Sequence, residues 1–116
     1  MKIKILLVLT AFVSMNVFAA GYVTVQIESI AIVGNAALGA HAAENMELKV
    51  KGGFTLPSGI SCDTNYITTK KDMYSNKTFA LLLAAKTSQQ PVTLIVADDA
   101  NYSAFPGRCS ILAVTF

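Results

Sequence analysis

Two cysteines are the residues of this chain whose type and spacing most directly predict chemistry. Cys62 and Cys109 are the only cysteines, and 47 positions separate them (109 − 62 = 47). They are too far apart for a Cys-x-x-Cys redox motif, and together with the single histidine, His41, they do not form a recognisable zinc-ligand spacing. In an exported protein such a pair usually forms a disulfide, because the destination is oxidising. We predict a structural disulfide that closes this loop and stabilises the fold by roughly 4 kcal/mol in the loop-entropy treatment.

The segment before the second cysteine contains side chains suited to ligand binding. Arg108 offers a planar set of donors to a carboxylated sugar, and aromatic rings offer faces on which a sugar stacks. The alternative is that Phe105 plugs one end of the fold and that Arg108 is simply solvated. The candidate ligand-binding residues are Tyr66, Tyr102, Ser103, Phe105 and Arg108.

Catalytic and metal chemistry have weaker support in the sequence. Catalysis requires a nucleophile with a base, or paired carboxylates in a cleft, whereas Glu28, Asp63 and Asp72 belong to unrelated segments. Residues 98–101 (DDAN) bring oxygen ligands together, but they lack the glycine and the distal glutamate of a calcium loop, which favours a solvated turn. We predict a protein that is not an enzyme and that has no metal or cofactor.

The N-terminal segment has the layout of a secretory signal peptide. Lys2 and Lys4 precede an apolar stretch, 5–12, and small residues follow. A retained membrane anchor is the alternative, but Ser14 and Asn16 interrupt the apolar run well before the roughly 20 residues that a spanning helix needs. Signal peptidase prefers small residues before the cut, so we predict cleavage after Ala19. Residues 1–19 are then the signal peptide, and 20–116 form one secreted or periplasmic domain.

The charge of the mature chain argues against nucleic acid as a partner. The signal removes two of the nine basic residues, which leaves 7 basic and 7 acidic side chains in the 97 residues that remain (116 − 19 = 97). A neutral chain with a single arginine lacks the basic surface of a nucleic-acid-binding protein. The apolar fraction is also inflated by the signal, so we expect no membrane insertion of the mature chain.

The pattern of apolar residues predicts a mostly β protein with one helix. Alternation of apolar and polar side chains indicates strands, and a change of phase near 28–30 indicates a bend or bulge in the first strand. Apolar residues at helical spacing after Ser75 or Asn76, either of which is a plausible N-cap, indicate the helix. The predicted strands are 22–33, 46–50, 60–69, 91–96 and 109–116, and the predicted helix is 76–87.

The order of these elements, β-β-β-α-β-β, is that of the OB-fold, a five-stranded Greek-key barrel whose strand faces and loops bind ligands. A long, bent first strand fits a barrel, because that strand must turn a corner. The alternative is another small mixed α+β sheet domain.

Three stretches of the sequence also resemble a known protein family. Ile60-Ser61-Cys62, the stretch FALLLAAKTSQQPVTLIV (79–96) and Gly107-Arg108-Cys109 resemble the binding subunit of subtilase-cytotoxin-like and pertussis-like toxins. The resemblance implies an OB-fold, a homo-pentameric ring, binding of cell-surface glycans and an exported catalytic toxin subunit as partner. The chain departs from these subunits at 92–96, which lack their aromatic residues, and it contains no tryptophan.

The predicted helix raises the question of an oligomer. Its segment 79–85 (FALLLAA) is apolar on nearly every face, which suggests an interface formed by Phe79, Leu81, Leu82 and Ala85. The alternative is that the alanines are good helix formers and only Leu81 is exposed. Two functions remain open: an exported glycan- or surface-ligand-binding protein, or a periplasmic structural or inhibitory module that binds another protein.

Overall fold

The protein is mostly β with one α-helix, as predicted. The structure is a computed structural model, and it describes residues 19–34 and 42–116. The predicted signal peptide, apart from Ala19, and His41 lie outside the described residues. The described elements are β1 (Ala20–Val25), β2 (Ile27–Ile32), β3 (Met46–Val50), β4 (Tyr66–Thr69), the short 3-10 helix η2 (Lys71–Met73), α1 (Asn76–Ser88), β5 (Val92–Ala97) and β6 (Ser110–Thr115).

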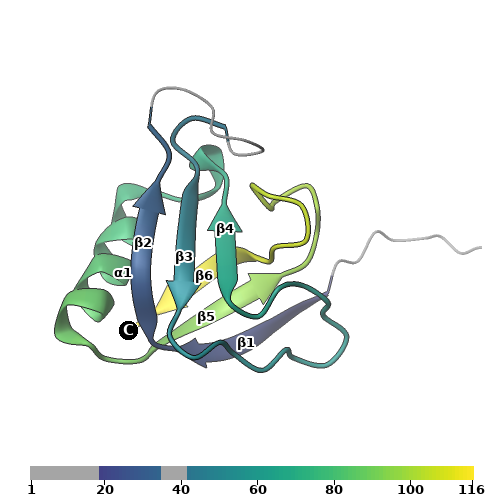
Figure 1. Ribbon diagram of the computed structural model, residues 1–116, viewed down its shortest axis with the longest axis horizontal. Coiled ribbons are helices and arrows are strands. Elements are labelled where there is room, and N and C mark those ends of the chain that lie inside the picture. Colours follow the sequence, from purple (N-terminus) through teal and green to yellow (C-terminus); the bar gives the residue numbers. More distant parts are fainter. Residues whose placement is uncertain (1–18, 35–41) are drawn as a thin grey trace, which may run out of the picture.

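The strands form two three-stranded antiparallel sheets, in the orders β1-β5-β6 and β2-β3-β4. Figure 1 shows that the two sheets lie face to face with their strands running in different directions, and that α1 lies alongside β2. This arrangement differs from the predicted five-stranded barrel in two respects. Six strands form, so the helix follows the fourth strand and not the third, and the strands belong to two sheets.

The extra strand arises because the predicted first strand divides at Gln26. Val25 pairs with Val92 of β5, whereas Ile27 pairs with Val50 of β3, so the chain changes sheets at this residue. The Lys51 N–H donates to the Gln26 carbonyl at 2.8 Å, which satisfies the backbone at the crossing point. The register of β2 then shifts between residues 27 and 29, where the sequence predicts a bulge.

The predicted strand 60–69 forms only over its last four residues, as β4. Its earlier part is held in a local turn by Asp63, whose carboxylate accepts from the N–H groups of Asn65 and Tyr66 at 2.8 and 2.9 Å. Short polar side chains that bond nearby backbone groups in this way compete with strand pairing. The chain therefore enters β4 from a turn that Asp63 fixes.

α1 closes one side of the core. Ser75 is its N-cap and forms a capping box with Thr78, as the sequence predicts for one of its two candidate caps. The helix packs against β2 and β6, and its Leu82 and Ala85 are fully buried. Among the described residues, no helix has the length and apolar character needed to cross a membrane.

Candidate ligand-binding surface

The predicted disulfide between Cys62 and Cys109 is present, with a Cα–Cα distance of 5.4 Å. It ties the turn before β4 to the end of loop 98–109, the connection between β5 and β6. Two backbone hydrogen bonds act beside it: the Asp63 N–H donates to the Gly107 carbonyl at 2.8 Å, and the Thr68 N–H donates to the Cys109 carbonyl at 2.9 Å. The end of this loop is therefore fixed against β4.

The middle of loop 98–109 is fixed by the hydroxyl of Thr68. This hydroxyl accepts from the Ala104 N–H at 3.1 Å and shares a hydrogen bond of 3.2 Å with the hydroxyl of Ser103. Ser103 in turn donates to the Phe105 carbonyl at 2.6 Å. Because the loop lies over Thr68, that side chain is fully buried.

The loop brings Arg108 between two aromatic rings. The guanidinium carbon lies 4.8 Å from the ring centroid of Tyr66 on β4 and 4.7 Å from that of Phe105 in the loop. Both distances are within the range of cation–π interactions. We call Arg108, Tyr66, Phe105 and the neighbouring Glu47 the Arg108 cluster. It lies on the outer face of the β2-β3-β4 sheet, the face that carries Glu47, Lys49 and Tyr66.

Glu47 supplies the opposite charge in the cluster. Its Oε2 lies 3.6 Å from the Arg108 Nε, and the two side chains are 23% and 22% exposed. The distance is that of an ion pair but is too long for a hydrogen bond, and the Nε itself is buried without a hydrogen-bond acceptor. About a fifth of each charged side chain thus remains accessible to a ligand.

A second ion pair continues this outer face along β3. The Lys49 Nζ lies 3.2 Å from the Glu28 Oε2 of β2. The hydrogen bond that Lys49 donates to Glu28, followed by the charges of Glu28 and Tyr66, raises the pKa of Lys49 above its ordinary value. Arg108 and Lys49 therefore each have a carboxylate beside them.

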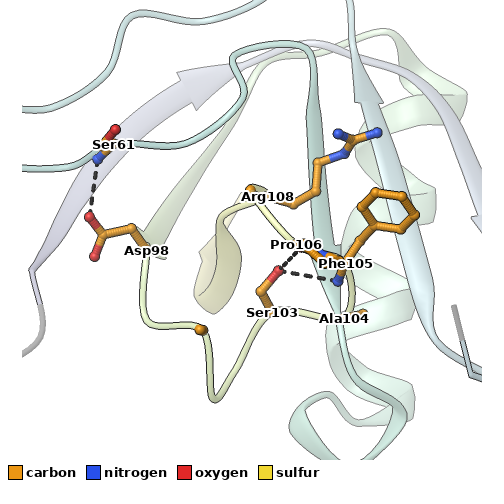
Figure 2. A pocket seen from close by; sticks show the side chains of 9 residues that line it. Ser61, Asp98, Ser103, Ala104, Phe105, Pro106 and Arg108 are labelled. Carbon is orange, nitrogen blue, oxygen red and sulfur yellow. Dashed lines mark hydrogen bonds between the residues drawn. The ribbon is translucent and has the colours of Figure 1, made fainter. Parts of the chain in front are cut away.

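A hollow of about 230 Å³ lies beside the cluster, and loop 98–109 forms most of its wall. Figure 2 shows the Arg108 guanidinium next to the Phe105 ring, on the far side of the hollow from Asp98. Asp98 accepts from the Ser61 N–H at 3.0 Å, so its carboxylate fixes the opposite rim.

The structure brings together three of the five predicted ligand-binding residues: Tyr66, Phe105 and Arg108. Ser103 lines the hollow, but its hydroxyl is used to hold the loop. Tyr102 lies in the turn that begins at Asp99, where its N–H donates to the Asp99 carbonyl at 3.0 Å. Sequence reasoning missed Glu47. The sequence indicated Glu47 only as a polar residue on the outward face of the alternating segment 46–50.

The helix residues predicted as an oligomer interface separate into two groups. Leu82 and Ala85 are fully buried in the core, and Phe79 is partly buried against it, because this side of α1 faces β2 and β6. Leu82 and Ala85 are therefore not available to another chain. Leu81 is 40% exposed and Leu83 is 44% exposed. The sequence alternative, in which Leu81 alone is exposed, thus omitted Leu83.

Comparisons of the chain with protein-family models, curated proteins and solved structures found no match. Within residues 19–34 and 42–116, no group of three or more histidine, cysteine, aspartate or glutamate side chains is arranged to hold a metal ion.

Proposed function

We propose that this protein is an exported, non-catalytic binding protein that uses the Arg108 cluster to bind a glycan or another surface ligand. The observation that carries the proposal is the position of Arg108 between Tyr66 and Phe105, partly exposed on the outer face of a sheet. Aromatic rings and a fixed planar donor are the groups with which proteins bind sugar faces and their hydroxyls.

The fold that best fits this function is a divided form of the OB-fold. In this reading β1 and β2 are two halves of one bent strand, because each half pairs in a different sheet. The parallel bridge between Ile67 and Cys109 then brings β4 and β6 together. OB-folds bind ligands on the face of their second and third strands and with the loop between the last two. Here those parts are β3, β4 and loop 98–109, which form the Arg108 cluster.

On the basis of the family resemblance, the proposal also includes a homo-pentameric assembly. A subunit like those of subtilase-cytotoxin-like and pertussis-like toxins would form a homo-pentamer and carry an exported catalytic subunit. The mass of the purified mature protein under native conditions tests this part. A ring of five supports it, and a monomer at micromolar concentration argues against it while leaving the binding surface untouched.

Binding to a glycan array tests the central part of the proposal. We expect the mature protein, 20–116, to bind a defined set of glycans and Arg108→Ala to abolish that binding, because the donor and its ring contacts are lost. Arg108→Lys should also lose most of it, since an ammonium cannot reproduce the planar donor geometry. Lys77→Ala, on the exposed side of α1, is the matched control and should bind normally. Equal binding by Arg108→Ala and the parent protein would contradict the proposal.

Exposed apolar side chains favour a second candidate function, in which the domain binds another protein. Leu81 on α1 and Leu112 and Phe116 at β6 are exposed, and these two elements pack together. Scattered apolar residues are common on protein surfaces, so this observation is the weaker of the two. A monomer that binds no glycan and co-purifies with one periplasmic protein, in a manner lost in Leu112→Ser, would favour this function.

A further inference from the structure

A second hollow, of about 460 Å³, adjoins the candidate ligand-binding surface. Ala104 of loop 98–109 lines both this hollow and the one beside the Arg108 cluster, so the two meet at that residue. The polar residues that line the second hollow come from the start of β3 and from the segment after β4: Asn45, Lys70, Lys71 and Asp72. We call it the Lys70 hollow.

Asn45 places hydrogen-bond donors in the wall of this hollow. Its side chain is 5% exposed, and its Oδ1 accepts from the Lys71 N–H at 3.0 Å, which fixes the orientation of the amide. Within the described part of the chain, the amide nitrogen has no hydrogen-bond partner, and it is not a fully buried atom. Its two N–H groups are therefore open to the hollow that Asn45 lines.

The backbone around Asn45 is held in place without any ligand. The Val33 N–H donates to the Asn45 carbonyl at 2.9 Å, and the Tyr74 hydroxyl donates to the carbonyl of the preceding residue, Glu44, at 2.8 Å. A donor fixed in this way costs little further ordering when a ligand binds to it.

Lys70 and Lys71 add positive charge to the same hollow. Both side chains are exposed, and neither forms an ion pair among the described residues. Asp72 is the one carboxylate among the described residues that line the hollow, so the lining side chains have a net charge of +1 (2 − 1 = 1). The Lys70 hollow is thus positive and rich in donors.

We propose that the Lys70 hollow binds a sulfate or phosphate ester carried by the glycan. The inference rests on the proposed function, because it assigns a further group of the same ligand. A tetrahedral oxyanion accepts hydrogen bonds from several directions, which suits the compact ammonium groups of Lys70 and Lys71 and the amide of Asn45. Asp72 can accept a hydrogen bond from a neighbouring sugar hydroxyl.

Matched sets of arrayed disaccharides test the proposal. The probes are lactose, cellobiose, chitobiose and mannobiose, each unsubstituted, with a sulfate ester and with a phosphate ester at C6 of the terminal sugar. We expect at least one ester to bind the mature protein about tenfold more tightly than its unsubstituted counterpart, because two ammonium groups and an amide contact the added oxyanion. The gain should shrink as the salt concentration rises, since exposed charges are screened. The separate sulfate and phosphate arms identify which ester is preferred.

Neutral variants of the two lysines should remove this gain. In the double variant Lys70→Gln, Lys71→Gln, the ester should bind nearly as weakly as the unsubstituted sugar, whose own affinity stays unchanged. Asn45→Asp keeps the acceptor for the Lys71 N–H but replaces the donors with a carboxylate, so it should lose the gain as well. The matched control is Lys51→Gln, Lys77→Gln, which removes the same charge from two exposed positions outside the hollow and should keep the gain.

The outcomes separate this inference from the proposed function. Esters that bind no better than unsubstituted sugars, or a gain that persists in the double lysine variant, would overturn the inference and leave binding at the Arg108 cluster intact. A gain that survives in Arg108→Ala but is lost in the double lysine variant would support the Lys70 hollow and contradict the Arg108 site. If no probe and no arrayed glycan binds the parent protein, both proposals are wrong. The lysine variants decide the matter even if Asn45→Asp does not fold, because both lysines are exposed.

Discussion

At the scale of single residues, Gln89 has a backbone conformation that side chains other than that of glycine disfavour. It ends α1 with φ of 57° and ψ of 35°, a left-handed conformation that glycine adopts at no steric cost. We expect Gln89→Gly to raise the free energy of unfolding by about 0.5–1 kcal/mol, because relief of the strain exceeds the entropy that glycine adds to the unfolded chain.

Thermal and urea denaturation measure this change. The backbone carbonyl of residue 89, which accepts from the Gln26 side chain at 3.3 Å, is retained in the variant. Gln89→Ala keeps the strain and should bring no gain. Equal stabilities of the glycine and alanine variants would show that the backbone conformation costs nothing here.

Gly21 is required for a different reason, because a side chain at this position would clash with Pro57. A Cβ at this position would lie 2.6 Å from the Pro57 Cβ and 2.9 Å from its Cγ, and a proline ring has little freedom to move away. We expect Gly21→Ala to lower the free energy of unfolding by about 1–3 kcal/mol, as overpacking does in well-packed interiors. Gly34→Ala is the control, because no atom of the described residues lies within 4 Å of its added Cβ, and it should change stability little.

Tyr74 provides a prediction about pH. Burial, followed by the charge of Glu44, raises the pKa of Tyr74 above its usual 10.0. Below pH 10 the phenol is protonated in both folded and unfolded chains, so it causes no pH dependence. Above pH 10 the unfolded chain loses this proton first, and the stability should fall until the pH passes the raised pKa of the folded state.

Denaturation of Tyr74→Phe between pH 8 and 11 tests this assignment. At pH 8 the variant should be less stable by about 1 kcal/mol, because the Tyr74 hydroxyl donates to the Glu44 carbonyl at 2.8 Å. The difference from the parent protein should then shrink as the pH rises above 10. A constant difference across this range would mean that Tyr74 does not cause the alkaline loss.

At the scale of elements, the attachment of loop 98–109 to β4 decides whether the Arg108 cluster exists. Thr68 is central to this attachment, since its buried hydroxyl holds both Ala104 and Ser103. Thr68→Val keeps the shape but leaves the Ala104 N–H without that acceptor. We expect the variant to lose about 1–3 kcal/mol of stability and to loosen the Phe105 and Arg108 side chains, which NMR relaxation can measure.

Thr24→Val is the control for this substitution. Thr24 shares an exposed hydrogen bond of 3.1 Å with Thr93, so its loss should cost little and leave the loop unchanged. If Thr68→Val retains parent-like order in loop 98–109, the disulfide and the backbone hydrogen bonds beside it are enough to hold the cluster.

The sequence predicts some elements well because their signals are local. Residues 46–50 alternate cleanly, and β3 has those bounds; Ser75 caps α1, which begins at the predicted residue. The division of the first strand could not be predicted in this way, because Val23, Val25 and Ile27 alternate without interruption across it. It depends on which distant strand each half meets, Val92 in one sheet or Val50 in the other.

At the scale of the whole molecule, the candidate site combines residues that only the tertiary structure brings together. The sequence predicts Arg108 and Phe105 as candidate ligand-binding residues because they are an arginine and an aromatic residue close to a cysteine. The role of Glu47 requires the pairing of β3 with β4 and the loop that lies above them, neither of which is visible in a local pattern. The sequence therefore predicts Tyr66, Phe105 and Arg108 as candidate residues but misses Glu47, the carboxylate beside Arg108.

NMR mapping of a bound ligand on the mature protein tests whether the Arg108 cluster is the binding surface. A glycan selected from the array is added to the labelled protein, and the amide and arginine side-chain signals are followed. We expect shifts at 47, 66 and 103–108, with signals of α1 and the end of β6 unchanged. Shifts confined to α1 and β6, around Leu81 and Leu112, would contradict this expectation and place the binding surface away from the Arg108 cluster.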